Sequence, residues 1–298
     1  MTNIIPVNTT YEPFSQEAAY VEANRLFLDR QSFQGVKRFL DLACGTGTVT
    51  QTLVQGSPTA HLNGIDYDPV QIQLISDRFR QGGYEVRSGF ELTCDVANGK
   101  PVVVFGARSA DDLPFPENTF DCVTIFHAIH MMPDKEKFLA AVNRVLKPGG
   151  IFGFNSTFYA GSIPPGGNRL YFEWLRMATE YINEKNVRLK AAGKPPIKRK
   201  RGTTHGAFAN RWLTGQEWTD LLAQHGLEVH DRHERVVEVD HRSFALVGAY
   251  GGLAEVLMSG YPVEESSEAL QACAKPAMDA EGVDMVARNY LEIWATKK

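Results

Sequence analysis

Short apolar segments alternate with amphipathic helical patterns through residues 36–157 of this chain. The apolar segments have the length of strands, and the first two end in an acid. Strands that alternate with helices form right-handed β-α-β units, which predicts an α/β fold built on a doubly wound, mostly parallel sheet. The five strands expected in this part cover residues 36–43, 61–68, 100–110, 120–130 and 151–157.

Two further strands, over residues 227–239 and 289–297, complete a seven-stranded sheet. After Thr157, Pro- and Gly-rich corners and helical patterns interrupt the alternation, and we interpret them as helical insertions that form a lid over the strand ends. An N-terminal helix is expected over residues 12–34, and the long segment 84–101 predicts a local excursion. The expected organisation is residues 1–159 for the N-terminal helix and the ligand-binding half of the sheet, 160–206 for a lid insertion, 207–240 for a return to the sheet, 241–286 for a second helical insertion and 287–298 for the last strand.

Composition excludes several classes of protein. A hydrophobic fraction of 43% can supply a packed core, and no apolar run approaches the roughly 18–20 residues of a membrane span. The formal net charge of −4 argues against nucleic acid as the main partner. The first residues lack the layout of a signal peptide, and the four cysteines contain no C-x-x-C pair. We therefore expect a cytoplasmic protein with reduced thiols and a small-molecule substrate.

The segment DLACGTGTVT, residues 41–50, places one carboxylate at the end of the first strand and then almost no large side chains. Ligands of doubly wound sheets bind at the carboxyl ends of the strands, and glycines let the backbone approach such a ligand closely. Asp41 would repel a phosphate group, so the loop favours a ligand with positive charge or several hydrogen-bond donors. Asp66 ends the second strand, where an acid commonly accepts hydrogen bonds from ribose hydroxyls.

Four segments in order along the chain resemble the motifs of class I S-adenosylmethionine-dependent methyltransferases. They are FLDLACGTG, GIDYDP, SADDLPFPENTFDCVTIFHAIHMMPD and RVLKPGGIF, and the resemblance covers about residues 35–155. It points to the branch that contains ubiquinone and menaquinone methyltransferases and many natural-product enzymes. One motif alone would be a weak signal, whereas four in register indicate the fold and the cofactor, S-adenosyl-L-methionine, but not the substrate.

The resemblance implies roles for residues at the strand ends. Asp41 would bind the methionine ammonium, directly or through water, and Asp66 would accept hydrogen bonds from both ribose hydroxyls. Tyr67 would pack beside the adenine, and the backbone N–H of Ala110 would face the adenine ring. The backbone that would line the methionine part belongs to Ala43, Gly45 and Gly47.

Two departures from the family pattern concern these loops. Ala43 stands where the first glycine of the family loop is expected, which is a mild change. Ser109 stands where the family often has an acid that contacts the adenine amino group. The Ser109 hydroxyl and the Asp111 carboxylate are both candidates for that contact.

The resemblance further implies an enzyme that moves a methyl group to a small, hydrophobic or aromatic metabolite and releases S-adenosyl-L-homocysteine. Phe126 and His127, at the end of the fourth strand, would lie near the sulfonium and its methyl group. His127 is the candidate general base, which is needed only if the nucleophile carries a proton. Two rival hypotheses remain: a cyclase or decarboxylase on the same fold, and a catalytically silent protein that keeps the nucleotide pocket.

Alternative ligands are less well supported by the sequence. The segment GTGTVT contains G-x-G, but Thr50 replaces the third glycine of a dinucleotide-binding loop, which disfavours NAD. The pairs His127/His130 and His230/His233 lack further metal ligands, so no metal is expected. We expect His130 to pack near the pocket and the second pair to lie on a solvated strand edge.

Two other features have more than one interpretation. The basic run over residues 194–202 is either a solvated loop or a clamp on an acidic group of the substrate. A set of aromatic side chains is expected mainly to pack in the core or lid, while a few line an apolar substrate pocket. The set comprises Tyr159, Tyr171, Phe172, Trp174, Phe208, Trp212 and Trp218.

Overall fold

The computed structural model describes residues 4–8, 10–200 and 211–298. These residues form two compact units. One unit contains the described residues within Met1–Tyr20, Ile163–Ala209 and Val236–Asn289, and the other contains those within Val21–Ser162, Asn210–Arg235 and Tyr290–Lys298. The second unit holds every residue that the sequence singles out for cofactor binding.

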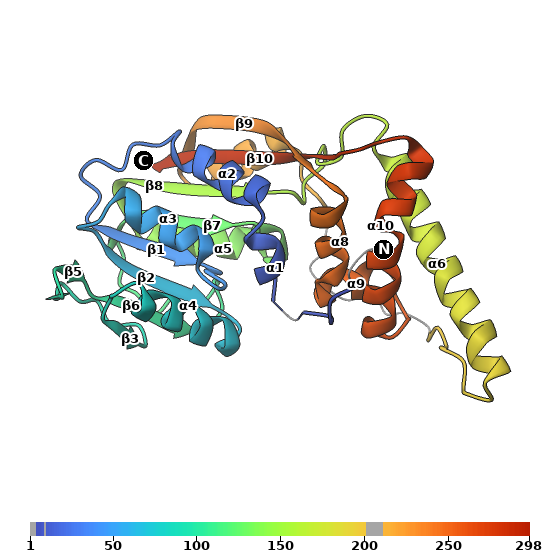
Figure 1. The fold of residues 1–298 in the computed structure, drawn as a ribbon. Helices are drawn as coiled ribbons and strands as arrows, with labels where there is room; N and C mark the ends of the chain where they lie inside the picture. Colours follow the sequence, from blue (N-terminus) through green and yellow to red (C-terminus); the bar gives the residue numbers. More distant parts are fainter. Residues whose placement is uncertain (1–3, 9, 201–210) are drawn as a thin grey trace. The chain divides into compact units, whose positions relative to one another are not determined.

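The described residues form an eight-stranded sheet, which confirms the mostly parallel α/β architecture. Figure 1 shows its strands together with the helices that connect them. The strand order is β3-β6-β2-β1-β7-β8-β10-β9. The neighbouring pairs from β3 to β8 are parallel, whereas β10 runs antiparallel to β8. The strands are β1 Arg38–Leu42, β2 His61–Asp66, β3 Val86–Ser88, β6 Val103–Ala107, β7 Phe120–Phe126, β8 Leu146–Ser156, β9 Leu227–Val239 and β10 Val286–Lys297.

The seven expected strands are all present. The eighth strand of the sheet, β3, was not expected. This strand lies in segment 84–101, for which the sequence predicts an excursion. The same segment forms a small two-stranded ribbon of β4 Val96–Ala97 and β5 Lys100–Pro101. The alternation pattern does not reveal β3 because it has only three residues, none of which is fully buried.

Helices connect the strands of the second unit. The connections are α3 Thr48–Gly56, α4 Pro69–Gln81, η1 Ile129–Met131, α5 Lys135–Val145 and α7 Gly215–Gln224. Three of these helices, α4, α5 and α7, begin at side chains that accept backbone N–H groups otherwise left unbonded in the first turn. Asp68 caps α4 in this way, and Thr214 and Glu217 form the predicted capping box at α7.

The other unit is built mainly from helices of the two expected insertions. They are α6 Asn168–Ala191, α8 His241–Ala249, α9 Gly251–Leu257 and α10 Val263–Glu281, and α10 packs against the other three. Trp174 on α6 is fully buried there and donates its indole N–H to Leu270 O on α10 at 2.7 Å. A lid role for this unit stays a prediction. Of the helices described, none combines the length and apolarity required to cross a bilayer.

The single N-terminal helix expected over residues 12–34 is wrong. The chain forms two helices instead, α1 Glu12–Ser15 and α2 Ala18–Leu28. Between them, the Glu17 N–H donates to Phe14 O at 3.0 Å. A hydrogen bond between residues three positions apart is typical of a tight turn, so α1 ends before α2 begins.

The boundary between α5 and β8 also differs from the expectation. The pattern over residues 134–150 predicts a helix that ends at the KPGG segment, but α5 ends at Val145 and β8 begins at Leu146. Pro148 has no N–H with which to continue a helix, and Gly149 adopts a φ of +76°. The segment therefore enters β8 as an irregular start, where the β7–β8 register shifts.

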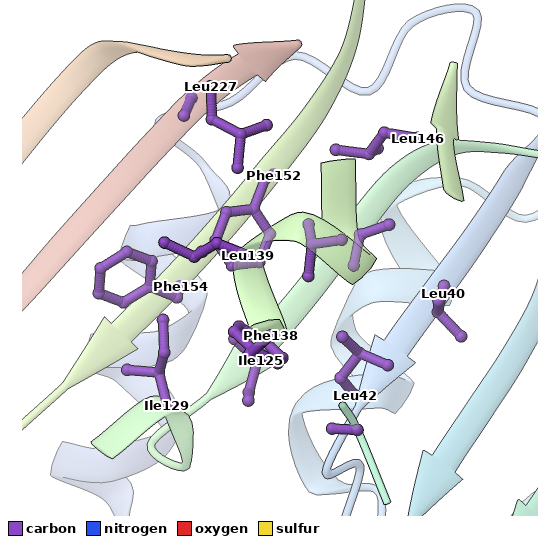
Figure 2. Close-up of a cluster of buried hydrophobic side chains, with 14 of the residues drawn as sticks. Leu40, Leu42, Ile125, Ile129, Phe138, Leu139, Leu146, Phe152, Phe154 and Leu227 are labelled. Atoms are coloured by element: carbon purple, nitrogen blue, oxygen red, sulfur yellow. The ribbon is translucent and has the colours of Figure 1, made fainter. Parts of the chain in front are cut away.

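The main apolar core of the second unit lies where α5 covers the sheet. Figure 2 shows Phe138 and Leu139 from α5 among side chains of β7 and β8, including Ile125 and Phe152. All four are fully buried, and burial of each such side chain contributes about 1.5–3 kcal/mol. This packing holds the carboxyl end of β7 in a fixed position.

Gly153 on β8 lies in close contact with Trp294 on β10, so a substitution of Gly153 can test how tightly the sheet is packed. The Trp294 ring stacks on Phe27, and a Cβ atom at Gly153 would lie 2.0 Å from Trp294 Cζ3. We expect Gly153→Ala to lower the free energy of unfolding by about 1–3 kcal/mol, because an overpacked side chain forces its neighbours to shift. Urea denaturation measures this loss. Trp294→Leu in the same chain should reduce it, and equal losses in both backgrounds would contradict the contact.

Candidate functional site

The loop after β1 turns through positive φ angles at alternate residues. Ala43, Gly45 and Gly47 have φ values of +51°, +54° and +85°. Glycine adopts this region easily, whereas Ala43 is strained there by about 1–3 kcal/mol. A Cβ atom at Gly47 would also lie 2.5 Å from Ile75 Cγ1 on α4. The loop therefore presents backbone, with almost no side chain, at the start of α3, where the first N–H groups lack partners within the helix.

Asp66, the last residue of β2, is hydrogen-bonded to that loop. Its Oδ2 accepts the Gly45 N–H at 2.8 Å, and its Oδ1 accepts the Asp68 N–H at 2.9 Å. Burial raises the pKa of Asp66, and these two backbone hydrogen bonds partly oppose the rise. Each carboxylate oxygen has a second lone pair, so Asp66 can accept further hydrogen bonds such as those of two ribose hydroxyls.

Asp41, on the neighbouring strand β1, is almost entirely buried, with 1% of its surface exposed. Thr50 Oγ1 donates to its Oδ2 at 2.6 Å, and Thr124 Oγ1 donates to its Oδ1 at 2.9 Å. Burial raises the pKa of Asp41 to about 7, although the two hydroxyl groups stabilise the charged form, and the charge of Asp66 adds to the rise. The two expected cofactor acids therefore lie close enough to influence each other.

The loop after β6 lies beside β2, because the Arg108 N–H donates to Asp66 O at 2.8 Å. Within this loop, Ser109 Oγ donates to Asp111 Oδ1 at 2.5 Å, and Lys137 Nζ lies 3.0 Å from Asp111 Oδ2. The Ser109 hydrogen bond and the Lys137 ammonium hold the pKa of Asp111 below its usual range. The two candidate adenine contacts are thus bonded to each other, and Asp111 stays ionised.

The other two expected adenine contacts differ in exposure. Tyr67 directly follows Asp66 and has 83% of its surface exposed, whereas Ala110 is buried. An exposed aromatic ring at this edge has an open face for a nucleobase, since stacking requires an accessible ring. Contact of either residue with an adenine stays a prediction.

Phe126 and His127 lie at the carboxyl end of β7. Phe126 is buried against Phe27, and His127 adopts a φ of +52°, which is uncommon for a residue other than glycine. His127 Nε2 lies 3.2 Å from Asn24 Oδ1, and the ring edge faces Tyr290 with 5.0 Å between centroids. Burial lowers the pKa of His127 to about 3, so the imidazole is neutral at physiological pH.

The expected cofactor residues therefore gather at the carboxyl ends of four adjacent strands, β6, β2, β1 and β7. Several polar partners of these residues were not predicted from the sequence, namely Asn24, Thr50, Thr124 and Asn155. Thr124 and Asn155 are polar residues inside otherwise apolar strands, and this pattern is the signal that could have revealed them.

The structure shows where three of the other histidines lie. His130 packs its ring on Phe158 with 4.1 Å between centroids, as a packing residue would. His230 and His233 lie on β9, which is an edge strand of the sheet. Across residues 4–8, 10–200 and 211–298, no group of three or more His, Cys, Asp or Glu side chains is arranged to hold a metal ion.

The basic run and the aromatic set are only partly described. Arg199 Nε donates to Ser259 O, and the Lys200 N–H donates to Gly260 O, so this part of the run packs on its own unit. Of the aromatic set, Phe172 is exposed, while core packing accounts for the fully buried members Tyr159, Trp174 and Trp218. Predictions that concern Arg201, Gly202 and Phe208 lie outside the described residues.

A bare backbone turn beside strand-end acids, on adjacent parallel strands, is an arrangement typical of nucleotide-binding α/β proteins. Residues 40–154 match the family model described as a methyltransferase domain. This part of the chain is a class I S-adenosylmethionine-dependent methyltransferase domain, as the sequence motifs indicate, and S-adenosyl-L-methionine is its cofactor.

Two relatives are similar over a stretch of comparable length. The ubiquinone/menaquinone biosynthesis C-methyltransferase UbiE of Teredinibacter turnerae is 40% identical over 115 residues, which are 38% of this chain and 40% of that protein. The demethylmenaquinone methyltransferase of Thermus thermophilus is 35% identical over 114 residues, which are 38% of this chain and 44% of that protein. The chain thus matches less than half the length of each relative.

Solved structures share the fold over most of the chain. The YcgJ protein of Bacillus subtilis has a TM-score of 0.55 at 18% identity, with 93% of this chain and 98% of that chain covered. The [4+2]-cyclase SpnF has a TM-score of 0.53 at 19% identity, with 99% of this chain and 89% of that chain covered. At these identities, the likeness establishes the fold alone.

The residues present fit the groups of S-adenosyl-L-methionine. Its ribose diol matches the remaining lone pairs of Asp66, and its ammonium and sulfonium match a carboxylate such as Asp41. The glycine-rich backbone between these acids leaves space for the methionine part, because a Cβ atom at Gly45 would meet no atom within 4 Å.

The raised pKa of Asp41 predicts that cofactor affinity depends on pH. Asp41 is protonated in the cofactor-free protein below pH 7, and only the carboxylate form balances an ammonium group. We expect the affinity for S-adenosyl-L-homocysteine to fall roughly tenfold from pH 8 to pH 6, as the competent fraction falls. Calorimetry at both pH values measures this, with Asp41→Asn as the comparison. A parent affinity that is constant, or that rises toward pH 6, would contradict the assignment.

Proposed function

We propose that the chain transfers the methyl group of S-adenosyl-L-methionine to a small, hydrophobic or aromatic metabolite, which is quinone-like or a natural product. The observation that carries the proposal is the hydrogen bond from Gly45 to Asp66, which sets a bare turn beside an acid suited to a ribose. The match of residues 40–154 to methyltransferase domains supports the reaction class, and the quinone methyltransferases among the relatives support the substrate class.

In this proposal, each polar part of the cofactor has a counterpart in the chain. Asp66 accepts the ribose hydroxyls, and Asp41 balances the methionine ammonium, directly or through water. Tyr67 covers the adenine, while the loop at Ser109–Asp111 contacts its edge. The backbone that lines the methionine part is that of Ala43, Gly45 and Gly47.

Methyl transfer is an in-line displacement in which the nucleophile, the methyl carbon and the sulfur are nearly collinear. The sulfonium is already reactive, so the main task of the protein is to hold both partners close and aligned, which can supply about 7–11 kcal/mol at its upper range. Positive charge spreads out as the methyl group leaves, so a site sheltered from water does not oppose the reaction. Phe126 provides apolar surface next to His127 for this purpose.

His127 is the proposed base for a nucleophile that carries a proton. Its neutral imidazole can accept a hydrogen bond from an O–H or N–H group and so orient the nucleophile. A pKa of about 3 makes the imidazolium a strong acid, but a nucleophile becomes far more acidic as its bond to the methyl group forms. The proton therefore moves to His127 late in the transfer, and it leaves again after the reaction. His127→Ala should mainly slow turnover.

Labelled methyl groups test the reaction and the role of Asp66 together. Extracted metabolites are incubated with S-adenosyl-L-methionine that carries a labelled methyl group, and mass spectrometry detects labelled products. We expect a labelled metabolite with the parent protein. Asp66→Ala should weaken the binding of S-adenosyl-L-homocysteine at least roughly tenfold, because hydrogen bonds to a charged group contribute about 1.5–3 kcal/mol each.

A matched control for this test is Asp77→Ala, which removes an exposed acid on α4 that pairs with Arg80. This variant should bind S-adenosyl-L-homocysteine like the parent. Equal affinity of parent and Asp66→Ala would contradict the proposed ribose contact. If the label stays in unreacted cofactor while an extracted metabolite is converted, a cyclase or decarboxylase would replace the methyltransferase in the proposal.

A further inference from the structure

A dense group of positive charges lies at the C-terminal end of α6 and in the segment that follows it. Between Glu184 and Glu217 the chain has nine lysines and arginines and no acid. Six of the nine are exposed residues that form what we call the basic surface, namely Arg188, Lys190, Lys194, Lys198, Arg199 and Lys200. Because the whole chain has a formal net charge of −4, this concentration of positive charge is a local feature.

A chain reversal brings the two halves of the basic surface together. Gly193 adopts a φ of +68°, and the Lys194 N–H donates to Leu189 O at 2.9 Å, so the chain turns back where α6 ends. Figure 1 shows this reversal at the end of α6. Asn186 then holds the returning segment, because the Ile197 N–H donates to Asn186 Oδ1 at 2.6 Å and Asn186 Nδ2 donates to Ile197 O at 3.0 Å.

The last part of the basic surface is attached to the segment between α9 and α10. The Lys200 N–H donates to Gly260 O at 2.8 Å, and Arg199 Nε donates to Ser259 O at 3.0 Å. The Arg199 guanidinium also lies over the ring of Tyr261, 5.6 Å from its centroid. The backbone of this part is therefore held by its own unit, while the lysines of the basic surface stay exposed.

Within the described part of the chain, no carboxylate forms an ion pair with the basic surface. Two acids of α10, Glu265 and Glu268, both lie 2.7 Å from Nζ of Lys185, which is not part of the basic surface. Positive charge in the last turn of a helix interacts favourably with its carbonyl groups, which accounts for Arg188 and Lys190. It does not account for the lysines beyond the end of α6, so their charges are available to an anionic partner.

Exposed apolar residues lie among these charges. Val187 is 70% exposed at the start of the basic surface, and Pro195 and Pro196 are exposed within it. Binding of single-stranded nucleic acid relies on aromatic side chains that stack on bases, and residues 187–200 contain none. A bilayer with anionic lipids offers phosphates to the cations and an apolar boundary beneath them to the valine and prolines. The combination therefore favours a bilayer as the partner.

We propose that the basic surface binds the anionic phosphate groups of a lipid bilayer, with Val187 and the two prolines at the boundary between headgroups and acyl chains. This binding follows from the basic surface alone and does not rest on the proposed methyl transfer. One consequence does rest on it. A hydrophobic methyl acceptor partitions into bilayers, so a protein attached to the same bilayer meets its substrate at a raised local concentration.

Sedimentation with vesicles tests the binding. The full chain is mixed with vesicles of phosphatidylcholine alone, or of phosphatidylcholine and anionic phosphatidylglycerol, and the protein in the pellet is measured. We expect binding to the anionic vesicles only, and release at high salt, because salt screens exposed charges. A parent protein that does not bind the anionic vesicles would overturn the inference. The measurement needs no turnover, so it decides the matter even if the proposed methyl transfer fails.

A triple variant locates the binding. Lys194→Gln/Lys198→Gln/Lys200→Gln should weaken the affinity for anionic vesicles about 100-fold, because each lysine near such a surface contributes about fivefold. It should keep the parent affinity for S-adenosyl-L-homocysteine, since Asp41 and Asp66 belong to the other unit. This second measurement separates a loss of vesicle binding from a loss of fold.

A matched control removes three exposed lysines from elsewhere on the chain, in the variant Lys37→Gln/Lys275→Gln/Lys298→Gln. It has the same net charge as the first triple variant and should bind the vesicles nearly like the parent. Equal losses in the two triple variants would overturn the assignment, because net charge alone would then explain the binding.

The apolar part of the surface distinguishes a bilayer from nucleic acid. Val187→Ser should weaken vesicle binding roughly threefold, because it removes apolar contact with the headgroup boundary. A single-stranded RNA oligomer should bind the parent more weakly than the vesicles do. RNA binding as tight as vesicle binding, together with vesicle binding that Val187→Ser does not change, would replace the bilayer by a nucleic acid.

Discussion

The hydrogen bond from the Gly45 N–H to Asp66 is the constraint on which the site depends. It joins the loop after β1 to the end of β2, so residues 21 positions apart form one surface. Each position has a physical requirement. Position 45 needs a residue that adopts a positive φ, and position 66 needs a carboxylate with lone pairs left for a ligand. The parallel pairing of β1 and β2 supplies the alignment, since it brings their carboxyl ends to the same edge.

Burial determines the electrostatics around this loop. It raises the pKa of Asp41 and lowers the pKa of His127, and in both cases it favours the neutral form. In the cofactor-free site near pH 7, His127 is therefore neutral and Asp41 is only about half ionised. A ligand with an ammonium and a sulfonium changes this balance, because positive charge stabilises the Asp41 carboxylate and further disfavours a charged imidazole.

The sequence predicts well those features that depend on local pattern. The alternation of apolar and helical segments gives the sheet, and FLDLACGTG and GIDYDP locate Asp41 and Asp66 at its edge. The sequence does not predict features that depend on contacts between distant parts of the chain. The strand β3 is too short for a periodic signal, and the KPGG segment lies within β8 although it also resembles a helix end. Asn24 and Asn155 are 131 positions apart, so only the fold brings them together at His127.

We propose that the turn between Ala43 and Gly47, together with Asp66, holds the nucleoside of the cofactor. A crystal structure of the chain with S-adenosyl-L-homocysteine would show whether it does. We expect both ribose hydroxyls within hydrogen-bond distance of the Asp66 carboxylate, with the methionine part along the backbone of the turn. A nucleoside bound away from the carboxyl ends of β1 and β2 would contradict it.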